Sequence, residues 1–134
     1  AEDNYSTVQH AFKAIASTLS IVSEQGKEGI KIDGSFHQHH AQIYSGGYGM
    51  SLTDDVSKFM EISVDTQFAN EFTLEKKEIF QKLLLEGHLL LSFRNSIDFG
   101  TRGRNISRPT SEYYSSCGCL GKGGRWRSCQ CRDL

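Results

Sequence analysis

Two leucine triplets, residues 83–85 and 89–91, constrain the fold of this chain more than any other feature of its sequence. They occupy the later turns of a segment that begins like a helix at Thr73, and they make that helix apolar on nearly every side. A helix without a polar face is normally buried between other helices. Three helices in a chain of 134 residues cannot easily bury that much surface. We therefore expect that packing partners of this helix are missing.

Hydrophobic spacing predicts two helices before the leucine-rich one. Apolar residues recur at steps of three and four from Val8 to Val22, which predicts an amphipathic helix over residues 5–24. Gly26 is expected to end that helix. A similar pattern predicts a second helix over residues 49–63.

The third helix and the loops complete the predicted architecture. Thr73 is a typical N-cap, and the helix after it is expected to reach about residue 93. Polar, glycine-rich loops fill residues 27–47 and 95–109, and Pro109 is expected to open a further helix. Loops of this length are usually functional or disordered. The sequence therefore predicts an all-α fold whose helices are joined by long loops.

Composition and charge narrow the function classes. Hydrophobic residues make up 37% of the chain, which suits a modest core, and the net charge of -1 shows no bias toward nucleic acid or membranes. No apolar run approaches the roughly 18 residues of a membrane helix. Residues 1–4 are acidic and polar, unlike a signal peptide, so we expect a chain that begins after processing or within a longer product. Eight basic residues against two acidic ones between Arg94 and Arg132 suit an anionic partner, or a solvated loop and tail.

The two loops hold the most specific motifs. The first reads DGSFHQHH over residues 33–40, the next helix contains DVSKF over 55–59, and the second loop reads FGTRGRNISRP over 99–109. A tyrosine also follows the last histidine of DGSFxQH by nine residues. In this order the motifs resemble polysaccharide lyase family eight, which contains the chondroitin AC, hyaluronate and xanthan lyases. The resemblance is close over residues 29–109.

This resemblance implies a fold and a set of site residues. It implies that the chain is a fragment of an incomplete (α/α) toroid. His39 matches the catalytic histidine of the family, and Tyr48 matches its catalytic tyrosine. Arg104 and Arg108 match the two arginines of the GRGxSRP motif. We assign His39, Tyr48 and Arg104 to catalysis, and Arg108 and Gln38 to substrate binding.

These residue types suit β-elimination. The reaction removes a weakly acidic proton next to a carboxylate, so the enzyme must neutralise the carboxylate and supply a base and an acid. A tyrosine can act as both if a nearby cation lowers its pKa, and Arg104 is the candidate cation. A neutral His39 can accept the proton or hold the carboxylate, and Arg108 can bind a carboxylate or sulfate. No cofactor is needed.

Other interpretations of the same residues remain open. The histidines of residues 37–40 could bind a metal with Asp33, or could be ordinary surface residues; we expect no metal. Tyr44 and Tyr48 could simply pack the loop. Asn105 stands where the family often has glycine, and nothing here matches the family's carboxylate-binding asparagine or its later glutamate.

The C-terminal tail does not match the family. We divide the chain into a partial lyase domain, residues 1–115, and a tail, residues 116–134, which contains two C-x-C pairs nine residues apart. The pairs suggest zinc ligands or disulfides, although the spacing is not a common zinc pattern. With suitable synonymous codons, a one-base shift from Cys117 encodes AAALEKVADGDPAN, a helix-forming peptide. We interpret the tail as a frameshift product, which sequencing of the gene tests.

The sequence thus predicts a lyase that cuts acidic, uronic-acid-containing polysaccharide. We expect a monomer with no nucleic-acid or membrane partner, and the resemblance implies secretion or a periplasmic location in a bacterium. The alternatives are an inactive remnant that still binds anionic glycan, or a small zinc-binding interaction module built on the tail.

Overall fold

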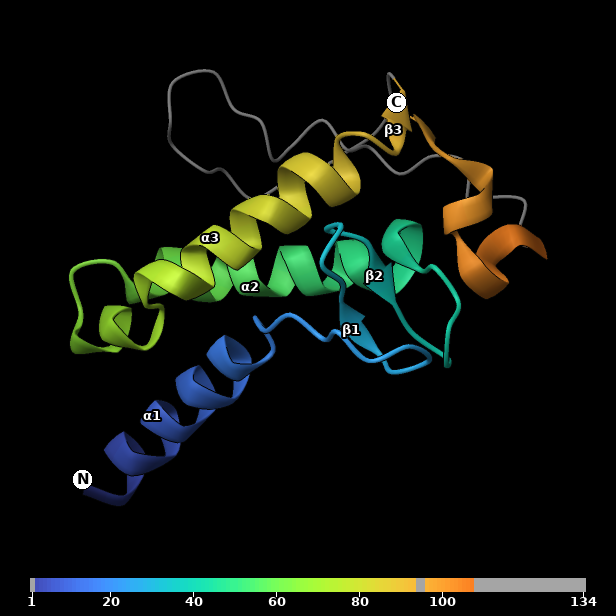
Figure 1. Ribbon diagram of the computed structural model, residues 1–134. Coiled ribbons are helices and arrows are strands. Elements are labelled where there is room, and N and C mark those ends of the chain that lie inside the picture. Colours follow the sequence, from blue (N-terminus) through green and yellow to red (C-terminus); the bar gives the residue numbers. More distant parts are fainter. Residues whose placement is uncertain (1, 94–95, 108–134) are drawn as a thin grey trace.

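The computed structural model describes residues 2–93 and 96–107, and this part of the chain is mostly helical (Figure 1). Its α-helices are α1 (Glu2–Ser17), α2 (Met50–Ser63) and α3 (Leu74–Lys82). A short 3-10 helix, Gln67–Glu71, lies between α2 and α3. The helix predicted over residues 49–63 is therefore confirmed.

The structure is mostly helical, as the sequence predicted, and two short hairpins interrupt its helices. β1 (Gly29–Ile30) pairs with β2 (Phe36–His37), antiparallel, in the loop that precedes α2. β3 (Ser92–Phe93) pairs in the same way with β4 (Ser96–Ile97) after the leucine-rich helix. Figure 1 shows the first hairpin beside the start of α2. Both hairpins lie in segments that were predicted as loop or as the end of a helix. The strands could not be predicted because two residues are too few to show an alternating pattern.

The first helix is shorter than its hydrophobic pattern predicted. α1 ends at Ser17, where the hydroxyl of Thr18 donates to the carbonyl of Ile15. Val22 was predicted to be helical, but its amide donates to the carbonyl of Ile30 over 2.8 Å, and Ile21 forms a parallel bridge with Ile30. Pairing with β1 has taken over residues that the periodicity assigned to the helix.

The third helix begins as predicted and ends early. The Thr73 side chain accepts a hydrogen bond from the Lys76 amide, which confirms the N-cap. α3 continues into a π-helical segment, η3 (Leu83–His88), and the chain then turns into β3 instead of staying helical to residue 93. A Cβ added at Gly87 would lie 2.0 Å from the Gly34 carbonyl oxygen, so the turn between β1 and β2 packs directly on the η3 backbone.

The core lies between the three helices and β1. It contains eight buried hydrophobic residues: Phe12, Ala16, Leu19, Ile30, Val56, Phe72, Phe80 and Leu83. The Phe12 ring stacks on Phe68 with centroids 4.8 Å apart and meets Phe59 edge-on at 5.3 Å. The leucine triplets divide: Leu83 is fully buried, whereas Leu89 and Leu90 are 47% and 75% exposed. Packing among the described residues therefore buries only part of the leucine-rich segment.

Some predictions concern residues outside the described part of the chain. The helix expected at Pro109 and the cysteine-containing tail, residues 116–134, lie there. Within residues 2–93 and 96–107, no helix has both the length and the apolar character required to cross a membrane.

Candidate active site

The loop before α2 folds into a π-helical turn that presents Tyr48. This turn, η1 (Ser45–Gly49), runs directly into α2, and the Tyr44 carbonyl accepts hydrogen bonds from the amides of Gly47 and Gly49, both at 3.1 Å. Its other residues are buried, but the Tyr48 side chain is 41% exposed. The backbone of the turn is therefore hydrogen-bonded and buried, whereas Tyr48 remains open to solvent.

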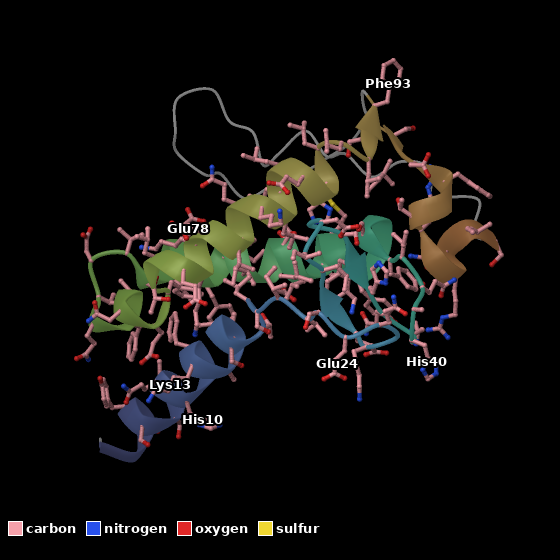
Figure 2. The ribbon with its side chains drawn as sticks, viewed as in Figure 1. His10, Lys13, Glu24, His40, Glu78 and Phe93 are labelled. Carbon is pink, nitrogen blue, oxygen red and sulfur yellow. The ribbon has the colours of Figure 1, made fainter. Side chains whose placement is uncertain are left out.

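His39 follows β2 in an unusual backbone conformation. His39 and His40 have φ angles of 55° and 69°, in the left-handed region that non-glycine residues rarely adopt. A carboxylate oxygen of Glu28 accepts a hydrogen bond from the His39 amide at 2.9 Å, which ties the strained segment to the residue before β1. His40 is exposed and points outward from its loop (Figure 2). The backbone thus directs the two neighbouring imidazoles differently.

The second loop forms two 3-10 turns, η4 (Phe99–Thr101) and η5 (Gly103–Ser107), and η5 carries Arg104. Arg102, which the sequence left without a role, is only 5% exposed and donates from Nη2 to the Ile97 carbonyl at 3.0 Å. Its guanidinium carbon also lies 5.7 Å from the centre of the Phe99 ring. Arg102 therefore fastens the second loop to β4, while Arg104 is exposed.

The two loops bring His39, Tyr48 and Arg104 together. Arg104 Nη2 lies 2.9 Å from His39 Nε2, and the His39 and Tyr48 ring centroids are 5.6 Å apart at 67°. The hydroxyls of Tyr44 and Tyr48, with Tyr44 having the larger effect, hydrogen-bond to the Arg104 guanidinium and raise its pKa. The Arg104 cation therefore contacts the His39 imidazole, and two phenols influence its pKa.

The contact with Arg104 determines how His39 can act. A guanidinium has donors only, so His39 Nε2 must accept, and the proton of the neutral ring lies on Nδ1. The Nδ1–H then remains as the group that can donate to a carboxylate. This arrangement suits His39 to holding an anionic group more than to removing a proton, and it leaves the phenol of Tyr48 as the nearby proton acceptor and donor.

Tyr44 is a member of the cluster that the sequence did not assign. It is 2% exposed, and its ring lies 4.9 Å from Tyr48 and 5.8 Å from His39, centroid to centroid. The sequence offered loop packing as one interpretation of Tyr44. A signal was present in its spacing, since Tyr44 and Tyr48 are four residues apart among glycines.

The remaining predicted site residues lie at the edge of the cluster or outside the part of the chain that the structure describes. Gln38 precedes His39 in the chain, and the backbone amide of Gln38 donates to the backbone carbonyl of Gln42 at 3.0 Å. The His37 side chain faces Ser35, whose hydroxyl lies 3.1 Å from His37 Nε2. Burial lowers the pKa of His37 most, and the charge of Lys31 lowers it further. Arg108 is not among the described residues.

The alternative of a metal site concerned Asp33 and the nearby histidines. Across residues 2–93 and 96–107, no group of three or more His, Cys, Asp or Glu side chains is placed to hold a metal ion. Asp33 instead accepts from the Ser35 hydroxyl and amide, and these two bonds lower its pKa. Asp33 therefore stabilises the turn between β1 and β2.

Comparison with known families decides the family of the chain. Residues 1–120 match the sequence model of polysaccharide lyase family 8, N-terminal alpha-helical domain. The chain belongs to polysaccharide lyase family 8. Two bacterial relatives agree: chondroitinase-AC of Pedobacter heparinus is 32% identical over 83 residues, and hyaluronate lyase HylB of Enterococcus faecalis is 29% identical over 101 residues.

The family 8 match covers much of this chain but little of each relative. The aligned residues are 62% of the chain and 12% of chondroitinase-AC, and 75% of the chain and 10% of the hyaluronate lyase. The chain thus spans about a tenth of the length of these lyases. In this family 8 chain, the described cluster contains the histidine, the tyrosine and the first arginine of the motifs that indicated the family.

Proposed function

We propose that this chain is part of a secreted or periplasmic bacterial lyase that cleaves uronic-acid-containing polysaccharide by β-elimination. The observation that carries the proposal is the contact between His39 and Arg104, with the exposed Tyr48 ring beside both. The family supports a glycan lyase, and the names of the two relatives suggest chondroitin or hyaluronan as the kind of substrate. Xanthan-type glycans are also candidate substrates, because the sequence motifs resemble a family that contains xanthan lyases.

The proposed reaction uses Tyr48 twice. In its deprotonated form, the Tyr48 oxygen takes the proton from carbon five of the uronate. The electron pair of that C–H bond forms the double bond to carbon four, and the bond from carbon four to the glycosidic oxygen breaks. Tyr48 then returns the proton to the departing oxygen, so that it ends deprotonated as it began.

Charged and polar groups around Tyr48 would stabilise the negative charge that develops on the uronate during this reaction. Arg104 places a permanent cation where negative charge develops, and the Nδ1–H of His39 can donate to the uronate carboxylate. We further propose that Arg108 forks onto a carboxylate or sulfate and that Gln38 contacts the sugar. Among the described residues, His39 contacts Arg104 and its ring lies beside that of Tyr48, so a substrate can reach these three groups from the same side.

We also propose that the helices are a segment of a larger (α/α) toroid. Leu85, Leu89 and Leu90 are between 42% and 75% exposed, although a run of leucines is normally covered. Neighbouring helices of the toroid would cover them. The same assembly would supply the asparagine and the glutamate that the family uses and that this sequence does not match.

The direct test is the ultraviolet absorbance of the conjugated, unsaturated uronate that elimination creates. The full lyase that contains this chain is incubated with chondroitin, hyaluronan or xanthan, and Tyr48→Phe is compared with Tyr5→Phe, a partly exposed tyrosine on α1 that stacks on Phe68. We expect absorbance to rise at similar rates for the wild type and Tyr5→Phe. For Tyr48→Phe, the rate of this rise should be lower by on the order of 100-fold or more. Equal rates for both variants would contradict the role of Tyr48.

A second candidate function is binding of acidic glycan without cleavage. The coverage of about a tenth of each relative favours it, because a lyase site assembled from many helices needs more than this segment supplies. Calorimetry with chondroitin or hyaluronan separates the two candidates. Salt-sensitive binding with no absorbance change for any glycan would favour the remnant over the lyase.

A further inference from the structure

We propose that Tyr44 is a positioning residue that joins the two site loops and holds Arg104 against His39 and Tyr48. This inference rests on the proposed function for its catalytic consequence, but its structural content stands on the contacts of one buried side chain. Tyr44 is among the largest fully buried side chains of the described residues, with 2% of its surface exposed. Its burial keeps it from reaching a polysaccharide, whereas Tyr48 is accessible.

The two edges of the Tyr44 ring contact the two loops. A Cβ added at Gly47 in η1 would lie 2.3 Å from Tyr44 Cε1, and one added at Gly103 in η5 would lie 2.3 Å from Cδ2 and Cε2. Real Cβ atoms essentially never come that close, so only glycine lets each backbone approach the ring. Gly103 also has a φ of 53°, which a side chain would strain. The ring is therefore clamped between the loop that carries Tyr48 and the loop that carries Arg104.

The backbone of Tyr44 fixes the same turn. Its amide donates to the Phe36 carbonyl of β2 at 2.8 Å, and its carbonyl accepts from Gly47 and Gly49. β2 leads to His39 and η1 carries Tyr48, so Tyr44 connects both catalytic candidates by main-chain bonds. The position of Tyr44 is thus determined by its backbone bonds and ring packing, without any contribution from Arg104.

The hydroxyl of Tyr44 gives the proposal its chemical content. Arg104 is an exposed, flexible side chain, and a guanidinium on the surface would ordinarily sample many rotamers. The Tyr44 ring packs on the backbone of Gly103, the residue directly before Arg104, and hydrogen bonding with Tyr44 is the largest cause of the raised pKa of Arg104, ahead of Tyr48. The buried ring fixes the backbone next to Arg104, and its phenol favours the rotamer in which Nη2 reaches His39. Two phenols thus share one guanidinium, with the buried phenol orienting it and the exposed phenol using it.

Tyr44→Phe tests the proposal because it keeps the ring between the two glycines and removes only the hydroxyl. The readout is the ¹⁵N chemical shift of His39 Nε2 in two-bond proton–nitrogen spectra, with Arg104→Gln as the reference for a lost contact and Tyr5→Phe as the matched control. We expect Tyr44→Phe to move the Nε2 shift most of the way to its Arg104→Gln value, and Tyr5→Phe to leave it unchanged. Where lyase activity is measured, kcat should fall on the order of tenfold with little change in KM.

The outcomes separate this proposal from the proposed function. A Tyr44→Phe protein whose Nε2 shift equals that of the wild type overturns the positioning role, even if the chain cleaves glycan. Conversely, a full protein containing this chain that has no lyase activity contradicts the proposed function, while a shift change in Tyr44→Phe still supports the role of Tyr44. Gly103→Ala provides a second variant: it should displace the ring and change the same shift, and a wild-type shift there would also count against the clamp.

Discussion

Arg104 donates from Nη2 to His39 Nε2 across 2.9 Å, although 65 residues separate them in sequence. His39 comes from the left-handed segment after β2, and Arg104 from a 3-10 turn after β4. A contact of this kind between an exposed guanidinium and an imidazole fixes the tautomer of the imidazole, with its proton on Nδ1. The pair therefore presents a positive charge and a directed N–H group beside Tyr48.

Replacing Arg104 with lysine should test the geometry of this pair rather than its charge. Lysine keeps the cation but lacks the planar fork that serves His39 and two phenols at once. We expect the rate of glycan elimination to fall on the order of 100-fold, with a smaller effect on glycan binding. Absorbance kinetics and calorimetry measure the two effects. If Lys at this position keeps full activity, charge alone suffices and the forked contact has no role.

Glu28 should be needed to hold the His39 backbone. Its carboxylate accepts from the His39 amide in a segment where two consecutive histidines have positive φ angles. Glu28→Ala removes the acceptor and should speed hydrogen exchange of that amide on the order of tenfold, whereas Glu28→Gln keeps an acceptor oxygen and should change it less. Exchange measured by NMR separates the two variants. Identical exchange in wild type and Glu28→Ala would show that the bond does not hold the loop.

His88 should make the fold less stable in mild acid. Burial lowers its pKa from 6.5 to about 4, while a hydrogen bond with the Gly49 backbone acts in the opposite direction. Below pH 6.5 the unfolded chain binds a proton that the folded chain does not, so stability falls as pH decreases toward 4, by up to about 3 kcal/mol. Urea unfolding at several pH values measures this loss.

Substitution isolates the contribution of His88 from that of other titrating groups. His88 Nε2 lies 2.9 Å from Thr53 Oγ1, and glutamine can replace that contact without titrating. His88→Gln should reduce the loss of stability between pH 6.5 and 4, whereas His10→Gln, on the exposed surface of α1, should leave it as in the wild type. Equal losses in the two variants would mean that His88 is not the group responsible.

Gly87→Ala should destabilise the chain through a single contact. The added Cβ would lie 2.0 Å from the Gly34 carbonyl oxygen, which is backbone and cannot rotate away. Forcing the turn off η3 should cost about 1–3 kcal/mol of unfolding free energy. Gly100→Ala is the matched control, because its Cβ would meet only a side-chain oxygen of Asp98 at 3.1 Å. Denaturant unfolding compares the two, and an equal effect would rule out the close packing of Gly34 on Gly87.

Several elements could be predicted from local sequence alone. Thr73 caps α3 and residues 50–63 form α2, because a cap and a 3.6-residue repeat act within one or two turns. The early end of α1 could not be predicted, because Val22 is drawn from the helix by a bond to Ile30 that forms only when β1 is in place. Leu89 and Leu90 followed a helical pattern but come after η3, where the chain turns toward β3.

The candidate site shows the same division. The order and spacing of His39, Tyr48 and Arg104 indicated the family and the residues to consider, because motifs preserve the chemical groups a reaction needs. The sequence could not show that Tyr44 lies between Gly47 and Gly103, or that Glu28 binds the His39 amide. Tyr44 and Gly103 belong to segments that are distant along the chain and meet only because the second loop packs against the start of α2, while Glu28 reaches the His39 amide only once β1 and β2 have paired. Sequence thus determined which groups are available, and tertiary structure decided which of them meet.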